Sequence, residues 1–383
     1  MTALGYSPDS AKGLDGRAAR RRLRDLDNLS TIEEIDSHGF LRSVEAFPAQ
    51  IEQAWSVGKE ARSLPDWGEI SSIAVLGVGG SGISGNVLKA VLGPAFPLFV
   101  HTCKGYELPG WVGPNTLVLA VSYSGETEEI LETVEKAQWR NSHIVTVSSG
   151  GTLNQLGERL GYPTSLLPVG LQPRAALGYL SMALLAVCQN LGWADFEADV
   201  AETVDLLTDR ASSYARQSPI ATNPAKQLAH RLVGTLPLIY GSEGLAEVAA
   251  YRWKCQLNEC SKVAAYHHLF PELNHNEISA WTEKGYGSCN PAVVVLRHPH
   301  EHARISKRIS VTTSLISEQG AVVEEVCAKG TSKLASLMDL ICLGDFVATY
   351  LALLRGIDPG QVEMIDEVKR RMSDARVTGD IVR

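Results

Sequence analysis

The sequence lacks a positive charge excess, cysteine pairs at metal-binding spacing and long apolar runs. Of its 383 residues, 43 are acidic and 35 basic, so the net charge of −8 predicts no nucleic-acid partner. The seven cysteines form no C-x-x-C motif, which indicates neither a disulfide framework nor a zinc knuckle. The first residues have no apolar core of signal-peptide length, and no uninterrupted apolar run reaches about 18 residues. We therefore expect a cytoplasmic protein without a membrane partner.

Short apolar runs alternate with helical patterns from residue 71 onward, which favours an α/β protein with helices covering parallel sheets. We predict a helical N-terminal extension over residues 1–70, a first α/β unit over 71–215 and a second over 216–383. The strand predictions cover residues 71–79, 97–103, 116–125, 142–151, 164–170, 291–299 and 321–330, with a strand, turn and helix over 236–260. The two units repeat in architecture rather than in sequence identity.

A glycine-rich stretch, VLGVGGSGISG at residues 75–85, satisfies the pattern G-x-G-x-x-G. A dinucleotide site also needs an acidic residue at the end of the second strand, about 20 positions on. The second predicted strand, at 97–103, ends in HTC and offers none. The lysine that follows the glycines of a nucleotide P-loop is missing too. We therefore expect no nicotinamide cofactor, and no other cofactor is indicated.

The same stretch suits a small phosphate, because the backbone N–H groups at the start of a helix point outward at the positive end of its dipole. A second polar stretch, SYSGETEE, follows the third predicted strand and brings three hydroxyl groups within six residues. Helix capping would account for one such hydroxyl but poorly for three. Both stretches follow strands, where open α/β sheets bind ligands. The predicted substrate-binding residues are Gly79, Gly80, Ser81, Ser122, Ser124 and Thr127.

These two stretches resemble the sugar isomerase (SIS) domain, whose members bind phosphosugars in this way. With QPRAALGYL, RWKCQLNECSK and FPELNHNEISAW, the chain resembles the bifunctional phosphoglucose/phosphomannose isomerases of bacteria and archaea. The resemblance covers about residues 71–383 and implies two tandem SIS-type, doubly wound units with mainly parallel sheets. It also implies interconversion of glucose 6-phosphate and fructose 6-phosphate, a phosphorylated hexose being the expected small-molecule partner.

Aldose–ketose isomerisation requires ring opening and movement of a proton between C1 and C2 through an enediolate, which calls for a base and a cation. The resemblance implies that Glu259 is the base and that Arg174 stabilises the enediolate. It further implies that His275 and Lys369 assist ring opening. In this family the histidine comes from the neighbouring subunit, so we expect a homodimer.

Two positions depart from the family pattern. Cys260 follows Glu259, where the family usually has Asn or another small residue. Gly360 and Gln361 stand where the family often has a Thr-Pro pair, whose Thr is linked to accepting the mannose epimer. This second departure leaves activity on mannose 6-phosphate open, and the epimer preference with it.

Several alternatives remain at this stage. Glu272 and Glu277, which flank His275, are the next carboxylates to consider. The alternate histidines of RHPHEH, at 297–302, could hold a metal on a strand, but a loop fits better and we predict no metal site. A non-catalytic phosphosugar sensor would bind substrate without turnover, although residues 1–70 show no clear helix-turn-helix. An amidotransferase would need an N-terminal cysteine, which residues 1–70 lack.

Overall fold

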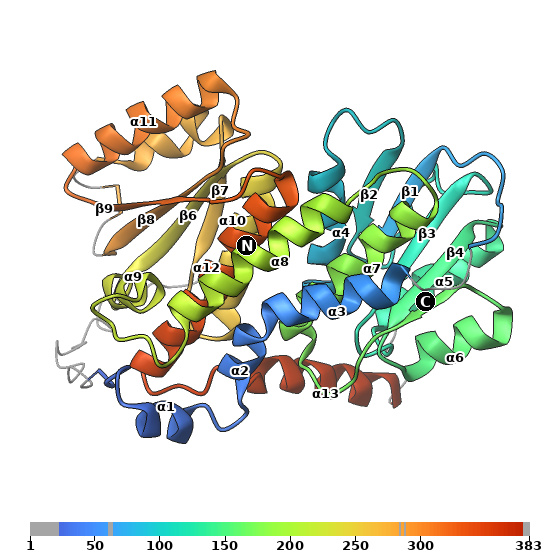
Figure 1. Cartoon of the computed structure of the whole chain (residues 1–383), viewed down its shortest axis with the longest axis horizontal. Helices are drawn as coiled ribbons and strands as arrows, with labels where there is room; N and C mark the ends of the chain where they lie inside the picture. The colour runs from blue at the N-terminus through green and yellow to red at the C-terminus, as the bar shows by residue number, and fades with distance from the viewer. Residues whose placement is uncertain (1–22, 60–63, 283–284, 287–288, 378–383) are drawn as a thin grey trace, which may run out of the picture.

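The computed structural model describes residues 23–59, 64–282, 285–286 and 289–377, so the first 22 residues of the predicted extension lie outside it. Two parallel sheets stand side by side with helices between and around them (Figure 1). The first sheet has the strand order β2-β1-β3-β4-β5. Its strands are β1 (Ser72–Leu76), β2 (Phe99–Cys103), β3 (Thr116–Val121), β4 (His143–Ser148) and β5 (Thr164–Leu166).

The second sheet repeats this arrangement with the order β7-β6-β8-β9. Its strands are β6 (Leu236–Ser242), β7 (Tyr266–Phe270), β8 (Pro291–Arg297) and β9 (Val322–Cys327). In each sheet the first strand in sequence pairs in parallel with both the second and the third. The predicted α/β class and the tandem parallel sheets are therefore confirmed, while the domain limits at residues 70 and 215 stay predictions.

The central strands explain why the sequence pattern was readable. All five residues of β1 and all six of β3 are buried, as expected for strands covered by helices on both faces. Strand β7 is not predicted, because it lies at the sheet edge and contains the adjacent polar residues His267 and His268. These two side chains lie on opposite faces, since the side-chain period of a strand is two.

The N-terminal segment contains α1 (Leu29–Ile35), α2 (Phe40–Glu45) and α3 (Phe47–Lys59). Helix α3 packs on α7 (Leu177–Asn190) and α8 (Glu197–Tyr214). Its Ile51 and Trp55 are buried in the main core. Of the described part of the predicted extension, the three helices lie within residues 29–59, whereas residues 23–28 and 64–70 are not helical. The extension also forms part of the hydrophobic core.

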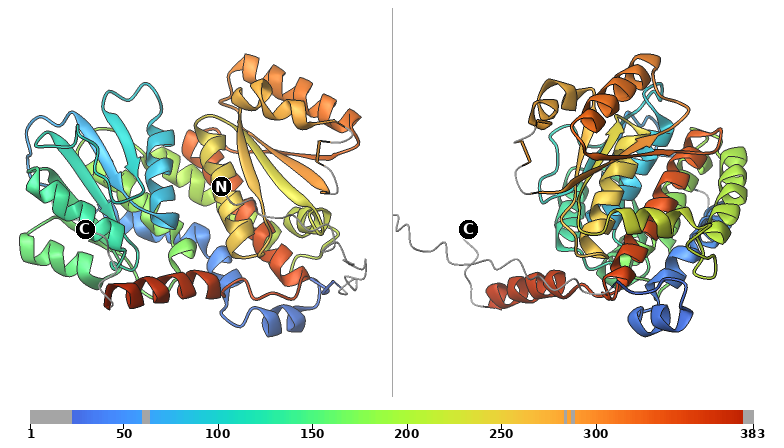
Figure 2. Two further views of the ribbon diagram at one scale, coloured as in Figure 1. Left: turned by 180° about the vertical axis from the view of Figure 1, so that it is seen from behind. Right: turned by 90° about the vertical axis from the view of Figure 1, so that its left-hand side faces the viewer.

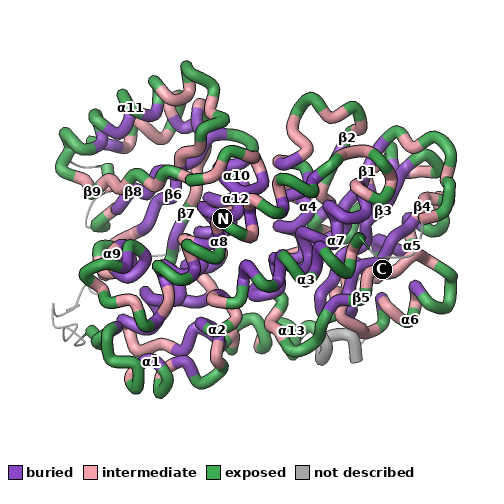
Figure 3. The backbone as a smooth tube through the Cα atoms, in the orientation of Figure 1, coloured by how far each residue is buried: buried purple, intermediate pink, exposed green. Residues whose placement is uncertain are grey.

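Helix α12 (Lys333–Leu354) is long and apolar enough to cross a membrane by length and composition alone. However, 94% of its most apolar window is buried inside the protein, between α8, α9 (Pro224–Arg231) and α10 (Leu245–Glu259). Figure 3 shows this helix buried along nearly its whole length. It is a core helix, and the carboxylates Asp339 and Asp345 interrupt its apolar run.

The remaining helices lie around the two sheets, except for α4, which packs on α7 and α10 between them. They are α4 (Gly79–Leu92), α5 (Glu128–Trp139), α6 (Gly151–Leu160), α11 (Ala303–Glu318) and α13 (Glu363–Val377). Helix α13 projects from the body of the molecule (Figure 2) and is mostly exposed.

Candidate active site

The glycine-rich stretch forms the first turn of α4 instead of a loop before it. Helix α4 begins at Gly79, with Val78 as its N-cap. Gly79 has a φ of +58°, which glycine adopts without strain. A Cβ on Gly82 would lie 2.5 Å from the carbonyl oxygen of Gly77, so the turn requires glycine there. As in any helix, the N–H groups of this first turn have no intrahelical acceptor, which suits them to an anion.

The second polar stretch connects β3 to α5. Thr127 is the N-cap of α5, yet its side chain makes no capping hydrogen bond. Its hydroxyl instead lies 2.8 Å from the hydroxyl of Ser122, which also accepts a hydrogen bond from the Gly125 N–H at 3.1 Å. Ser124 is exposed, and its hydroxyl accepts from the Glu126 N–H at 3.2 Å. Capping therefore does not explain why Thr127 is present.

A direct contact joins the two stretches. The buried hydroxyl of Ser81 accepts a hydrogen bond from the backbone N–H of Tyr123 at 3.3 Å. A Cβ on Gly125 would lie 1.9 Å from the carbonyl oxygen of Gly150, so the bend after β3 requires glycine. The structure thus places both predicted phosphate-binding stretches together at the carboxyl edge of the first sheet.

Arg174 lies in a short 3₁₀ turn, Pro173–Ala175, directly before α7. It is 6% exposed, and its guanidinium stacks on the ring of Phe40, 4.7 Å from the ring centroid. One terminal nitrogen donates to the carbonyl oxygen of Pro359 at 2.7 Å. Its Nε has no hydrogen-bond partner among the described groups and lies 3.9 Å from Oε2 of Glu259. Arg174 is therefore a cation that is almost excluded from solvent and lies beside the Glu259 carboxylate.

Glu259 is the last residue of α10, and 30% of its side chain is exposed. Lys262 follows in a tight turn with a φ of +53° and donates to the carbonyl oxygens of Glu259 and Gln361. Burial raises the pKa of the neighbouring Cys260 thiol to about 11, which keeps it protonated. Cys260 is thus a small buried residue of this turn rather than a nucleophile.

The first turn of α4, residues 79–82, which is the predicted phosphate-binding turn, adjoins Arg174. A Cβ on Gly80 would lie 2.9 Å from the carbonyl oxygen of Pro173 and 3.3 Å from the Cα of Arg174. Gly80 is thus the residue that lets α4 approach the 3₁₀ turn. Together with the 3.9 Å separation of Arg174 and Glu259, this contact makes one cluster from residues of both halves of the chain.

A buried ion pair that the sequence analysis missed anchors this cluster. Arg252, on α10, bonds both carboxylate oxygens of Asp345, on α12, at 3.0 and 2.8 Å. The same guanidinium donates to the carbonyl oxygen of Arg174 at 2.5 Å. The signal in the sequence was the pair of aspartates, Asp339 and Asp345, inside an apolar helix, because buried carboxylates are nearly always paired.

One predicted catalytic residue, His275, lies apart from this cluster. His275 is exposed in a 3₁₀ turn, Glu272–His275, beyond the carboxyl end of β7. Glu259 lies at the opposite, amino edge of the same sheet, since α10 runs back along it before β7 begins. Five strand residues span about 16 Å. Lys369 is exposed on α13, which starts two residues after Gln361.

The corresponding turn of the second sheet does not suit an anion. Helix α10 also starts just after a central strand, β6. There the carboxylate of Glu247 accepts from the Gly244 N–H at 3.2 Å, and Glu247 lies in the first turn of the helix. This negative charge occupies the position that a phosphate would need. The predicted phosphate-binding stretch at the start of α4 therefore has no counterpart at the start of α10.

The histidines of RHPHEH serve the local backbone. Nδ1 of His302 accepts from the Arg304 N–H and caps α11, while Nδ1 of His298 accepts from the His300 N–H. No cluster of three metal-ligating side chains occurs in the part of the chain that the structure describes.

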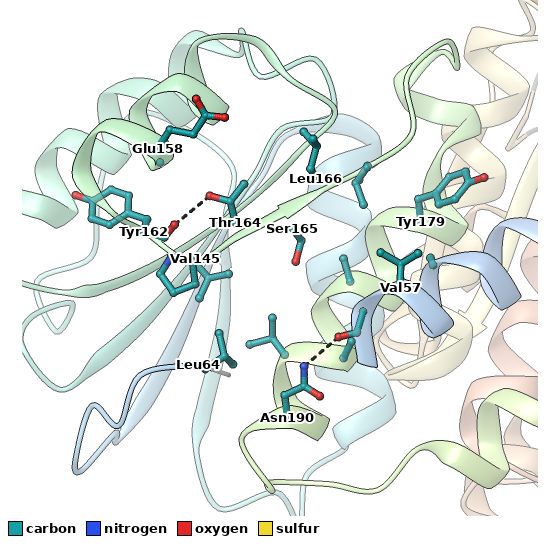
Figure 4. A pocket seen from close by; sticks show the side chains of 18 of the residues that line it. Val57, Leu64, Val145, Glu158, Tyr162, Thr164, Ser165, Leu166, Tyr179 and Asn190 are labelled. Atoms are coloured by element: carbon teal, nitrogen blue, oxygen red, sulfur yellow. Dashed lines mark hydrogen bonds between the residues drawn. The ribbon is translucent and has the colours of Figure 1, made fainter. Parts of the chain in front are cut away.

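A separate cavity of about 1080 Å³ lies beside the edge strand β5 (Figure 4). It is lined mainly by apolar side chains of α3 and α7, such as Val57 and Val187, with Leu166 of β5. None of the predicted site residues lines it. It therefore offers no convergent charges for catalysis and is distinct from the Arg174–Glu259 cluster.

Comparison with known proteins identifies the family of this chain. A family model described as the bacterial phospho-glucose isomerase C-terminal SIS domain matches residues 221–372. A bifunctional phosphoglucose/phosphomannose isomerase of Caldicellulosiruptor bescii is 37% identical over 335 residues, which span 87% of this chain and 99% of that protein. The enzyme of the same name from Thermoplasma acidophilum is 37% identical over 306 residues, spanning 80% and 91%.

More distant proteins share the fold. A D-glucosamine-6-phosphate 4-epimerase of Sulfolobus acidocaldarius is 29% identical over 320 residues, 83% of this chain and 95% of that protein. The crystal structure of a hypothetical protein from Thermus thermophilus superposes with a TM-score of 0.69 at 16% identity, covering 91% of this chain and 94% of that one. On the sequence relationships, the chain belongs to the family of bifunctional phosphoglucose/phosphomannose isomerases.

Proposed function

We propose that this protein interconverts glucose 6-phosphate and fructose 6-phosphate in the cytoplasm, without a cofactor. The observation that carries the proposal is the contact between the phosphate-binding turn and the Arg174–Glu259 pair. A Cβ added to Gly80 would lie 3.3 Å from the Cα of Arg174. Nε of Arg174 lies 3.9 Å from Oε2 of Glu259. A hexose whose phosphate is bound at the first turn of α4 therefore extends toward a buried cation and a carboxylate.

The chemistry follows from these positions. Backbone N–H groups at Gly79 and Gly80 and the hydroxyls of the two stretches bind the phosphate. Glu259 removes a proton from C2 of the open-chain aldose and returns it to C1, through an enediolate, while the hydroxyl proton of O2 passes to O1. Arg174, whose Nε makes no hydrogen bond within the described residues and lies 3.9 Å from Glu259, stabilises the negative oxygen that forms on the way. Because the guanidinium is 6% exposed, water screens this charge only weakly.

We further propose that His275 acts in the site of a second subunit, where it assists ring opening together with Lys369 of the site's own chain. The topology supports this, because His275 and Glu259 lie at opposite edges of the second sheet of one chain. The exposure of His275 leaves it accessible to a partner. A two-fold symmetric dimer would then build two equivalent sites.

An activity panel tests the proposal. The purified protein is offered glucose 6-phosphate, mannose 6-phosphate, fructose 6-phosphate and glucosamine 6-phosphate, and the products are followed by coupled assay and chromatography. We expect conversion between glucose 6-phosphate and fructose 6-phosphate, and the second and fourth substrates report epimer preference and epimerase activity. Tight binding of the hexose phosphates without turnover would contradict the proposal and favour a phosphosugar sensor.

A further inference from the structure

A carboxylate network lies on the outer face of the second sheet, away from the Arg174–Glu259 cluster. Oε1 of Glu277 accepts the hydroxyl proton of Tyr240, on β6, and Oε2 is bonded to Nδ1 of His268, on β7. The Tyr286 hydroxyl approaches Oε1 at 3.5 Å. Nε1 of Trp281 donates to the Tyr240 oxygen at 3.2 Å. Side chains of β6 and β7 are thus hydrogen-bonded to the Glu277 carboxylate. This carboxylate has no role in the proposed chemistry.

The network belongs to the segment that carries His275. Glu277 begins a 3₁₀ turn, Glu277–Ala280, that follows the turn Glu272–His275 after a single residue, Asn276. The Asn276 side chain accepts from the Glu277 N–H at 2.6 Å and donates to Glu272 at 3.0 Å. The segment therefore has its own internal bonds, and Glu277 attaches it to the sheet.

One of the two groups bonded to Glu277, the Tyr240 hydroxyl, belongs to a buried residue of an inner strand. Tyr240 is 1% exposed and packs edge-on against Phe270. Burial, together with the Glu277 charge, holds the pKa of Tyr240 far above its usual range, so the hydroxyl remains a donor. The carboxylate, by contrast, is 21% exposed at the side-chain level. A buried donor on a strand thus fixes a partly exposed carboxylate two residues from an exposed histidine.

We propose that Glu277 is a positioning residue for His275: bonded to Tyr240 and His268, it fixes the 272–280 segment on the second sheet so that His275 projects toward the partner's site. This inference rests on the proposed function, in which His275 assists ring opening. Glu277 itself does not touch the substrate, and its effect is confined to where His275 is held. Its removal should therefore affect turnover more than phosphate binding.

Steady-state kinetics on fructose 6-phosphate and glucose 6-phosphate provide the first test. Glu277→Ala should lower kcat at least tenfold with KM changed less than threefold, because the phosphate-binding turn is remote. Glu277→Gln keeps an acceptor for Tyr240 and should retain most of kcat. The matched control is Glu301→Ala in the same sheet unit. It removes a carboxylate that is 5% exposed and paired with Arg297, and should lower stability without lowering kcat.

Mixed dimers provide the second test. In a dimer of Glu259→Gln and His275→Ala subunits, one site keeps both groups if His275 acts across the interface, so an equal mixture should regain about a quarter of wild-type activity. Glu277→Ala should likewise be rescued by mixing with Glu259→Gln. It should not be rescued by mixing with His275→Ala, because both changes damage the same contributed segment. A folding defect in Glu277→Ala alone would not make rescue depend on which of the two other variants is its partner.

The outcomes separate the two proposals. If His275→Ala retains wild-type kcat, the proposed role of His275 fails, and the positioning role of Glu277 fails with it. If His275→Ala is impaired but Glu277→Ala keeps kcat within twofold of wild type, or loses no more than Glu301→Ala does, only the inference about Glu277 is overturned. Rescue of Glu277→Ala by His275→Ala would overturn it as well.

Discussion

The buried pair of Arg252 and Asp345 allows stability and catalysis to be separated by mutation. Arg252 is 2% exposed at the side-chain level and Asp345 is 8% exposed. Replacing Arg252 with Met leaves a buried carboxylate without its partner, which costs about 3–5 kcal/mol of unfolding free energy. It also removes the hydrogen bond to the carbonyl oxygen of Arg174.

The double variant Arg252→Met/Asp345→Leu removes both charges and fills the space with apolar atoms. Replacing a buried pair in this way is often neutral or stabilising. Urea unfolding should therefore show that the unfolding free energy of the double variant is within about 1–3 kcal/mol of the wild-type value. The remaining difference is the cost of leaving the Arg174 carbonyl unpaired. A displacement of about 1 Å at a catalytic group can cost about 100-fold in rate. We thus expect kcat in the coupled fructose 6-phosphate assay to stay 10- to 100-fold low in the double variant.

The separation makes the reasoning refutable. If the double variant regains both stability and kcat, Arg252 serves folding alone and the bond to the Arg174 backbone has no catalytic role. If Arg252→Met unfolds at the wild-type urea concentration, the pair carries no stability and the electrostatic argument is wrong.

Three further predictions concern the phosphate-binding turn, the segment before α13 and a helix start. Ser81→Ala should raise KM for the sugar phosphate about 10-fold or more, because it removes a hydrogen bond to the charged phosphate. Ser84→Ala, which removes a buried hydroxyl in the same helix, should leave KM unchanged. Equal KM values for the two variants would contradict this prediction. Gly360→Thr should lower unfolding free energy by about 1–3 kcal/mol, because its Cβ would lie 2.4 Å from that of His38; an unchanged urea midpoint would show that the segment yields freely. Burial raises the pKa of Glu202, but hydrogen bonds from the Thr331 and Ser332 region outweigh it and lower the pKa to about 2. Glu202 therefore stabilises the fold above about pH 4.5 and loses this effect as the pH falls toward 2. Glu202→Gln should flatten this part of the plot of unfolding free energy against pH. A plot parallel to that of wild type would contradict the lowered pKa of Glu202.

Much of the fold could be read from the sequence because the buried strands are continuous apolar runs. The two helix starts that follow β1 and β3 were recognisable for the same reason, since glycines and hydroxyl residues come directly after those runs. Edge strand β7 carries no such run, and its adjacent histidines gave no periodic signal.

The long-range contacts of the site could not be read in the same way. Phe40 stacks on Arg174 across more than a hundred residues of chain, and Asp345 reaches Arg252 from another helix. Such contacts depend on how helices pack, which local patterns do not encode. Sequence resemblance implied that Arg174 and Glu259 work together, but only the structure shows that they lie 3.9 Å apart.

The central claim is that Glu259 moves a proton between C1 and C2. Its most direct test is incorporation of solvent deuterium at C2 of glucose 6-phosphate in D2O, followed by NMR, with wild type and Glu259→Gln compared at equal concentration of folded protein. Wild type should incorporate deuterium on the timescale of turnover, and Glu259→Gln should be slower by about 100- to 10,000-fold, the usual contribution of a general base. Exchange by Glu259→Gln at a rate near that of wild type would contradict the account.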